Sequence, residues 1–199
     1  MGTRAELGLL GGPRRMLSGA LFADSSDVAA HVRAAREGDG AAFTELYSRF
    51  ARMVHGILMA RVPLREVDDL VQDVFLRAWK QLHSLRDPSC FGGWLATVAR
   101  NRAHDFHRRS VDTEELDENQ EPQGNPAHRA SLPSDQGAEI LELIKTLPDA
   151  YREPLILRLV EGMTGAEIAE RVGITPGSVR VNLHRGMQML REELRGRGL

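Results

Sequence analysis

Residues 175–190 read TPGSVRVNLHRGMQML, and this stretch decides how the C-terminal part of the chain folds. Thr175 is a favourable N-cap, and Pro176 follows at the first helical position, where its missing N–H costs nothing. Apolar residues then recur at spacings of four and seven, at Val179, Leu183 and Leu190. The spacing predicts a helix that begins at Thr175 and buries one face.

The segment before it predicts a shorter helix and a tight turn. Helical periodicity runs from Thr164 to Gly173. The apolar side of this helix and of the turn comprises Ile168, Ala169, Val172 and Ile174. Gly173 stands where the turn needs a permissive backbone. Two helices joined in this way predict a helix-turn-helix, whose second helix presents its N-terminal end to the major groove of DNA.

The outward side of the second helix carries side chains that suit base recognition. Its outer residues near the N-terminal end are Gly177, Ser178, Val181, Asn182 and Arg185. Arg185 suits guanine, Asn182 suits adenine, and Val181 suits a thymine methyl group. Arg180 and His184 lie to one side and suit phosphate, which positions a protein without specifying sequence. The alternative is a helical hairpin whose polar face is merely solvated.

A second helix with a basic face is predicted from Trp94 to Arg109, WLATVARNRAHDFHRR. Its basic residues fall at i, i+4, i+7 and i+8 on one face, at Arg100, His104, His107 and Arg108, with Asn101 and Arg109 beside them. Such a stripe fits a phosphate track along separated or distorted DNA. A solvated charged face is the alternative. A metal site at His104 and His107 would lack a third positioned ligand.

A third helix, from about Glu66 to Leu82, has an acidic outer face. Its outer residues, at i, i+3, i+4 and i+7, are Asp69, Gln72, Asp73 and Leu76. Its inward residues are Leu70, Val71, Val74, Phe75 and Ala78. An acidic stripe that ends in an exposed leucine suits docking to a basic protein surface, with inert solvated surface as the alternative.

Charge and composition divide the 199 residues into two small all-α domains joined by an acidic linker. Lys and Arg outnumber Asp and Glu by 11 to 7 over residues 43–110, whereas residues 111–139 carry 1 against 8. The sequence therefore predicts a disordered leader over 1–26, a helical domain over 27–110, a flexible linker over 111–138 and a second helical domain over 139–199. In this scheme Asp27 caps the first helix.

Other classes of protein fit the composition poorly. The single Cys90 excludes an internal disulfide framework and a cysteine-rich zinc site, and it fits a reducing cytoplasm. Apolar runs are too short for a membrane span. A formal net charge of −2 argues against a protein that is basic all over.

Three segments occur in a fixed order: VDDLVQDVFLRAWK at 67–80, FGGWLATVARNRAHDFHRR at 91–109, and a block over 147–194 that begins LPDAYREPLILRLVEGMTGAEIAERVGITPGSVRVNLHR. Together they resemble the extracytoplasmic-function (ECF) sigma factors of bacterial RNA polymerase. The resemblance implies a sigma region 2 domain and a sigma region 4 domain joined by a flexible linker, with no catalytic residue, cofactor or metal.

The resemblance also implies a role for each surface. The residues expected to bind the clamp coiled coil of core RNA polymerase are Asp69, Gln72, Asp73 and Leu76. Those expected to recognise and open the −10 element of promoter DNA are Arg86, Phe91, Arg100, Asn101, His104, His107, Arg108 and Arg109. Those expected to read the −35 element are Thr175, Ser178, Arg180, Val181, Asn182, His184 and Arg185. Members of the family are typically held inactive by an anti-sigma factor, often membrane-bound.

The chain departs from the family pattern in places, and Val181 and Asn182 stand where the family usually carries more basic residues. Gly186 and Met187 stand where the family often has alanine and arginine, and a glycine weakens a helix by about 1 kcal/mol relative to alanine. Two other functions stay open at this point. A stand-alone helix-turn-helix regulator would need a dimer interface, for which no spare apolar helix face is evident. A metal-dependent nuclease built around His104, Asp105 and His107 would lack a carboxylate cluster.

Overall fold

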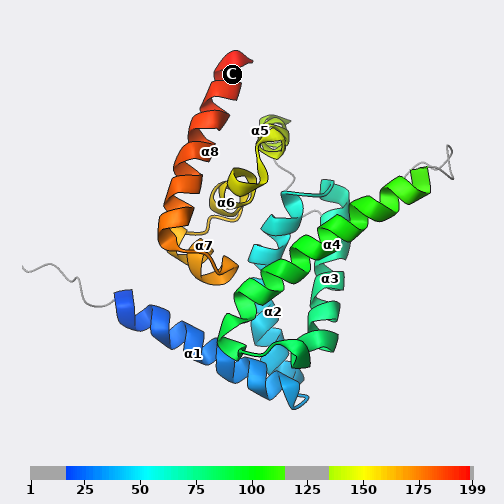
Figure 1. The fold of residues 1–199 in the computed structure, drawn as a ribbon, viewed down its shortest axis with the longest axis vertical. Coiled ribbons are helices and arrows are strands. Elements are labelled where there is room, and N and C mark those ends of the chain that lie inside the picture. Colours follow the sequence, from blue (N-terminus) through cyan, green and yellow to red (C-terminus); the bar gives the residue numbers. More distant parts are fainter. Residues whose placement is uncertain (1–16, 115–134, 198–199) are drawn as a thin grey trace, which may run out of the picture.

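The structure, a computed structural model, describes residues 17–114 and 135–197, with side chains described for 27–109 and 137–197. Its helices are α1 (Leu17–Arg36), α2 (Gly40–Met59), α3 (Leu64–Gln81), α4 (Phe91–Glu114), α5 (Asp135–Thr146), α6 (Asp149–Leu159), α7 (Gly165–Val172) and α8 (Pro176–Gly196). Two short 3-10 turns, Leu82–Ser84 and Pro88–Cys90, lie between α3 and α4. The all-α prediction is confirmed for these residues, which form one group of helices from α1 to α4 and another from α5 to α8 (Figure 1).

The first group is built around α2. Asp39 caps this helix by accepting hydrogen bonds from the backbone N–H groups of Ala41 and Ala42. Its apolar residues recur at helical spacing and are almost fully buried: Leu46, Phe50, Met53, Val54, Ile57 and Leu58. α1, α3 and α4 all pack against α2, and the Phe91 ring of α4 meets Phe50 edge-on with ring centroids 5.1 Å apart. α2 is therefore the centre of this core.

The second group encloses a smaller core. Its buried residues include Leu143, Ile144, Leu147, Leu155, Ile156, Met163, Ile168, Val172, Val179 and Leu190. α8 packs against α6 and α7, and it approaches α6 closely because position 186 is glycine. A Cβ atom there would lie 2.9 Å from Leu155 Cδ1 and 3.1 Å from Tyr151 Cβ. The glycine that departs from the family pattern thus has a packing reason.

The structure corrects the predicted start of the first helix. α1 already begins at Leu17, so the predicted leader of residues 1–26 is too long and Asp27 lies inside the helix instead of capping it. α4 continues to Glu114 and α5 begins at Asp135. Residues 1–16 and 115–134, which hold most of the predicted leader and linker, lie outside the described residues.

Two side chains fix the turn that leads into α4. Arg36, in the last turn of α1, donates from Nε to the carbonyl oxygen of Leu82 at 3.1 Å and from Nη2 to that of Leu85. Asp87 caps the following turn by accepting hydrogen bonds from the N–H and the hydroxyl of Ser89, and these bonds lower the pKa of Asp87. The segment between α3 and α4 is therefore anchored at both ends.

The two helical groups pack against each other through glycines. A Cβ at position 56 in α2 would lie 2.7 Å from Leu157 Cδ2 of α6. A Cβ at position 92 would lie 2.6 Å from the carbonyl oxygen of Arg171, at the end of α7. Gly93 and Gly173 also approach each other, because a Cβ on Gly93 would lie 3.5 Å from the Cα of Gly173. At Gly92 the neighbouring atom belongs to the backbone, so a larger residue there would have to push the end of α7 away.

Candidate functional site

The helix-turn-helix is fixed by caps at both of its helices. Thr164 and Glu167 form a capping box at the start of α7, in which Glu167 accepts from the Thr164 N–H at 2.7 Å. This bond is the main reason that the pKa of Glu167 is lowered. Gly173 ends α7 with a positive φ of 76°, and Thr175 starts α8 by accepting from the Ser178 N–H at 3.1 Å. The predicted helix-turn-helix is confirmed.

The outward side of α8 presents the residues expected to read DNA. Arg180, Val181, His184 and Arg185 are exposed and together line a shallow hollow of about 390 Å³. Thr175 and Ser178 are also exposed, although their hydroxyl groups bond each other at 2.8 Å. Asn182 is half-buried and does not line the hollow. The structure therefore brings four of the seven residues into one surface.

The polar side of α4 is exposed along most of its length, but it is not purely basic. Asn101 and His104 line a hollow of about 340 Å³ that they share with Asp105. Arg77 of α3 donates to Asp105 Oδ2 at 3.2 Å, which is the largest cause of the lowered pKa of Asp105, and Arg108 lies 3.7 Å from its Oδ1. The carboxylate required by the nuclease alternative is therefore held by two arginines.

The remaining residues predicted for the −10 site have different surroundings. Arg86 and Arg109 are exposed. His107 is also exposed, and its Nε2 donates to the carbonyl oxygen of Arg61 at 2.6 Å. Phe91 is 0% exposed, between Phe50 and Trp94. The prediction that Phe91 contacts DNA is corrected, because its ring is a core side chain.

The outer face of α3 is exposed at three of its four predicted residues. Asp69, Gln72 and Leu76 are exposed, with Leu76 at 57%. Asp73 instead accepts two hydrogen bonds from the buried Arg102 of α4, from Nε at 3.0 Å and from Nη2 at 2.8 Å, whereas Nη1 of Arg102 has no partner among the described residues. Asp73 therefore holds α3 to α4, and its replacement would leave a buried guanidinium unpaired.

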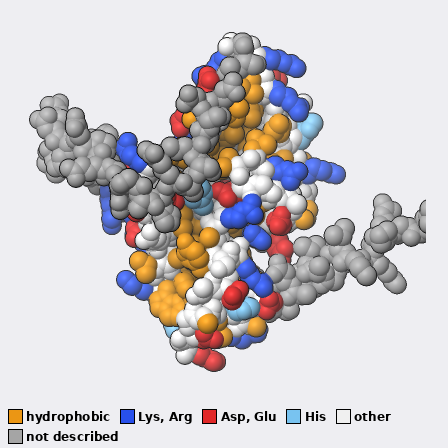
Figure 2. All heavy atoms as spheres, turned by 180° about the vertical axis from the view of Figure 1, so that it is seen from behind, with side chains coloured by type: hydrophobic (Ala, Val, Ile, Leu, Met, Phe, Trp, Pro, Cys, Tyr) orange, Lys and Arg blue, Asp and Glu red, His pale blue; other side chains and the backbone are white. Residues whose placement is uncertain are grey.

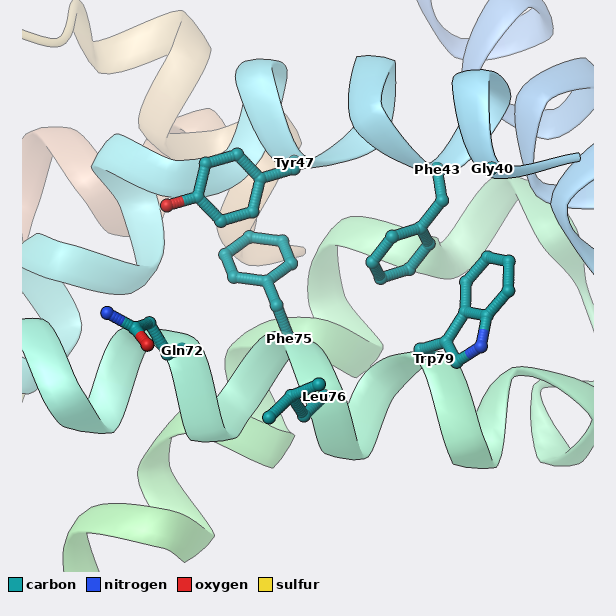
Figure 3. A pocket seen from close by; sticks show the side chains of 7 residues that line it. All are labelled: Gly40, Phe43, Tyr47, Gln72, Phe75, Leu76 and Trp79. Carbon is teal, nitrogen blue, oxygen red and sulfur yellow. The ribbon is translucent and has the colours of Figure 1, made fainter.

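An apolar groove of about 450 Å³ lies beside this face, between α2 and α3. Phe43 and Tyr47 point from α2 towards α3, Phe75 and Trp79 point back, and Gln72 and Leu76 lie along the rim (Figure 3). Ring centroids are 4.7 Å apart for Phe43–Trp79 and 4.5 Å for Tyr47–Phe75.

The groove is open to solvent. Tyr47 is 40% exposed and Trp79 is 37% exposed. Hydrophobic side chains gather on this part of the surface (Figure 2, lower left). A concave aromatic surface of this size on a small domain is typical of a protein-binding site.

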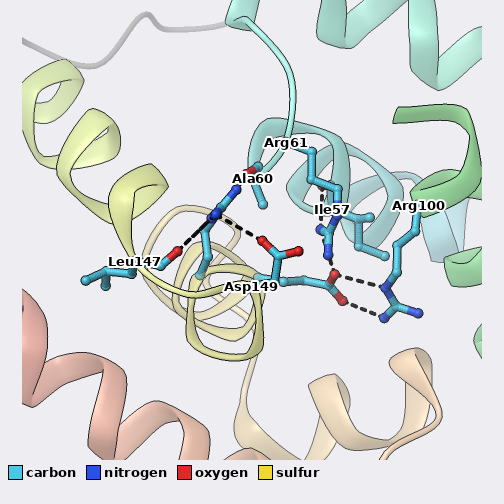
Figure 4. Close-up of polar contacts among 8 residues, drawn as sticks. Ile57, Ala60, Arg61, Arg100, Leu147 and Asp149 are labelled. Atoms are coloured by element: carbon cyan, nitrogen blue, oxygen red, sulfur yellow. Dashed lines mark hydrogen bonds and ion pairs between the residues drawn. The ribbon is translucent and has the colours of Figure 1, made fainter. Parts of the chain in front are cut away.

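One carboxylate joins the two helical groups. Glu153 of α6 is 5% exposed and accepts from Nε and Nη2 of Arg100 in α4, at 3.0 and 2.6 Å. Arg61, which follows α2, reaches the same carboxylate at 2.8 Å, so that two guanidinium groups converge on it (Figure 4). Arg152 adds a hydrogen bond to the carbonyl oxygen of Ala60. Arg100, expected to contact DNA, is thus engaged by the other helical group.

A second carboxylate joins the groups nearby. Glu161, just after α6, lies 2.7 Å from Nδ1 of His55 in α2 and 3.7 Å from Nε of Arg52. The hydrogen bond to Glu161 raises the pKa of His55 above its ordinary value and outweighs the opposing effect of burial.

The sequence did not predict the ion pairs that join side chains of different helices. The partners Arg102, Glu153 and Glu161 lie far from their counterparts in the sequence, and no local pattern pairs them. The aromatic groove had a usable signal. The apolar stripes of α2 and α3 are wider than the part of each helix that packs in the core, because they also include Phe43, Tyr47 and Trp79.

Two family descriptions match the chain. "Sigma-70 region 2" matches residues 46–112, and "Sigma-70, region 4" matches residues 137–190. The first match covers most of the α1–α4 group and the second covers most of the α5–α8 group, which are called region 2 and region 4 below. No helix among the described residues is long and apolar enough to cross a membrane.

Similar proteins carry the same assignment. The chain is 34% identical over 164 residues to the RNA polymerase sigma factor CarQ of Myxococcus xanthus, covering 80% of this chain and 92% of that protein. It is 33% identical over 174 residues to the ECF RNA polymerase sigma factor SigD of Mycobacterium tuberculosis, covering 82% of each. The fold resembles that of CnrH in its complex with the cytosolic domain of CnrY, with a TM-score of 0.57, 24% identity and coverage of 85% of this chain and 98% of that one.

Proposed function

The chain belongs to the ECF family of RNA polymerase sigma factors, which direct transcription initiation, and we propose that three of its surfaces divide this work. The α3 face and the aromatic groove dock on core polymerase. The polar side of α4 holds the −10 element, and the outward side of α8 reads the −35 element. The protein itself supplies no catalytic residue, and it acts on promoter DNA in the cytoplasm.

The observation that carries this proposal is that the α3 face and the groove beside it lie apart from region 4. α3 has no contact with α5–α8 among the described residues, so its outer face is open whatever region 4 does. The groove places the exposed aromatic side chains of Tyr47 and Trp79 beside Leu76 and the acidic Asp69. An apolar centre with charge at its rim suits a stable protein partner better than a charged stripe alone.

DNA contact by α8 rests on its geometry. The N-terminal end of the helix is capped by Thr175 and is therefore rigid, and its outward residues are polar or basic around Val181. Arg185 is the best candidate for base recognition, because a guanidinium can bond two acceptors of one guanine. Arg180 is the candidate for a phosphate contact.

An anti-sigma factor is the third partner that we propose. CnrH was solved in complex with the cytosolic domain of CnrY, and another structural relative, RpoE of Bartonella quintana, was solved with the anti-sigma factor NepR. RpoE is 24% identical to this chain, with a TM-score of 0.50 and coverage of 76% of this chain and 95% of that one. The stand-alone regulator has no comparable support.

Binding to core polymerase tests the docking assignment. Asp69→Arg reverses an exposed charge on α3, and we expect it to lower the affinity for core polymerase by about tenfold or more, because like charges then face each other. Glu45→Arg makes the same reversal at an exposed site of α2 outside the groove and is the matched control. Equal affinities of the two variants would remove α3 from the docking surface.

A further inference from the structure

The segment that joins α3 to α4 borders the surface proposed for −10 DNA. Gln81, the last residue of α3, is exposed and lines the hollow of about 340 Å³ on the polar side of α4, together with Asn101 and His104. Arg86 is exposed further along the segment. Amide and guanidinium groups are the side chains that bond the edges of adenine and guanine. Gln81 and Arg86 are therefore suited to base contacts beside α4.

The start of this segment is held by Arg36 of α1. The guanidinium donates from Nε to the carbonyl oxygen of Leu82 at 3.1 Å and from Nη2 to that of Leu85. Both leucine side chains are buried, so the backbone and the side chains are fixed together here. Leu82 directly follows Gln81, and Leu85 directly precedes Arg86. The orientation of the two bonded carbonyl groups therefore sets the direction in which each neighbouring polar side chain leaves the backbone.

Arg36 itself stands at a fixed junction between two helices. It is the last residue of α1, and Gly38 follows with a positive φ of 98°, which turns the chain sharply towards Asp39, the N-cap of α2. A cation in the last turn of a helix is favoured by the helix dipole without any further partner. Arg36 nevertheless uses two donors on carbonyl groups that lie 46 and 49 residues away in the sequence. Its contacts therefore serve the segment between α3 and α4 more than the end of α1.

We propose that Arg36 is a positioning residue for −10 recognition, which holds Gln81 and Arg86 in the orientation in which they read bases and does not itself touch DNA. The inference rests on the proposed function, since it takes the hollow beside α4 as part of the −10 site. Contact residues that are fixed before binding lose less conformational entropy when DNA binds. α1 thereby takes part in promoter selection, although it carries none of the residues predicted to contact DNA.

Two variants weaken this anchor to different degrees. Arg36→Met keeps an unbranched side chain and a good helix former but removes every donor. Arg36→Lys keeps the charge and three donors but lacks the planar fork that holds two carbonyl groups at once. Arg33→Met is the matched control. Arg33 is exposed one turn earlier on α1, and in the described part of the chain its side chain donates no hydrogen bond and acts on Asp87 through its charge alone.

Base preference is measured with the complete protein bound to core polymerase, on a promoter library that is randomised at the −10 and −35 elements and carries a barcode in each transcribed part. Arg36→Met should lower the preference for the favoured base at one or more −10 positions by about fivefold or more, because a base contact loses its geometry. Arg36→Lys should fall between Arg36→Met and the parent protein. Preference at −35 should stay unchanged in both variants, and Arg33→Met should match the parent protein at both elements.

A combined variant shows whether Arg36 acts through its two neighbours. In a protein that carries Gln81→Ala and Arg86→Ala, the addition of Arg36→Met should change no −10 preference further, because neither side chain is left to position. A further change there would overturn the positioning role. So would an intact −10 preference in Arg36→Met, or in Arg36→Lys where Arg36→Met does not fold, however far overall activity falls. If Gln81→Ala with Arg86→Ala leaves the −10 preference intact, the placement of the −10 site at this segment fails as well.

Discussion

Gly186 shows how a single residue can have opposite effects in an isolated helix and in a packed one. Alanine is the better helix former by about 1 kcal/mol. In α8, however, a Cβ would approach Leu155 Cγ and Tyr151 Cβ to 3.1 Å, and neither atom is the free end of a side chain. Packing therefore decides the residue at this position.

Gly186→Ala is expected to destabilise the protein by about 1–3 kcal/mol, because the added methyl group overpacks the contact between α6 and α8. Urea denaturation measures the change. Gly196→Ala is the control, since this glycine lies in the same helix and has no atom within 4 Å of the added Cβ. A stabilised Gly186→Ala protein would show that α6 and α8 are less closely packed than the structure indicates.

Arg185 and Arg180 are expected to differ in how their loss changes DNA recognition. Arg185→Ala should reduce binding to the preferred −35 sequence by about 1–3 kcal/mol and relax specificity at one position. Arg180→Ala should weaken binding to all sequences alike, as loss of a phosphate contact does. Affinities measured across single-base variants of the site distinguish the two. An equal loss on every sequence for Arg185→Ala would reassign it to the phosphate backbone.

At the scale of single residues, the sequence predicted exposed functional side chains better than their partners. Residues on the outer face of α8 were predicted from periodicity alone, because a capped helix fixes which positions face outward. Asp73 was placed correctly in its helix, but its ion pair with Arg102 comes from a different helix. Phe91 was assigned to DNA from its position in the family motif, and its burial depends on Phe50 in α2.

At the scale of helices, the predicted order and type of element agree with the structure, while several boundaries differ. Caps such as Thr175 and breakers such as Pro63 act within a few residues and can be read locally. α1 was predicted to begin at Asp27 because that residue is a good cap, yet the helix begins at Leu17. The groove between α2 and α3 could not be predicted in shape, since it depends on how two helices pack.

The groove predicts a second test of polymerase docking at the level of these two helices. Leu76→Asp places a charge at the rim beside Trp79, and we expect it to weaken binding to core polymerase by about 1–3 kcal/mol. Leu76 is 57% exposed, so the thermal stability of the free protein should change little. Leu76→Met, which keeps an apolar side chain, is the control. Unaltered affinity of Leu76→Asp would mean that the groove lies outside the docking surface.

At the scale of the whole molecule, contact between regions 2 and 4 should respond to pH through His55. The groups that face His55 are Glu161 beyond α6, Arg52 on α2 and Asp68 on α3. Since the pKa of His55 is raised above its ordinary value of 6.5 where the two regions meet, their contact is favoured below that pH. This contribution is lost as pH rises through the raised pKa of His55.

Energy transfer between dyes at Ser48→Cys on α2 and Gln188→Cys on α8, with the native thiol removed by Cys90→Ser, should therefore fall as the pH is raised from the acidic to the alkaline side of His55 titration. His55→Gln should remove most of this dependence, because the neutral amide does not titrate. Lowered energy transfer in acid, with His55→Gln behaving like the parent protein, would show that His55 and Glu161 do not make the contact between regions 2 and 4 depend on pH.

Run-off transcription with core polymerase from the source organism, on a pooled library of promoter sequences, tests the central claim most directly. Reactions with the protein should yield transcripts that are absent without it and that share two upstream motifs, and Arg185→Ala should change the upstream one. Core polymerase that initiates no protein-dependent transcript would contradict the assignment of this chain as a sigma factor.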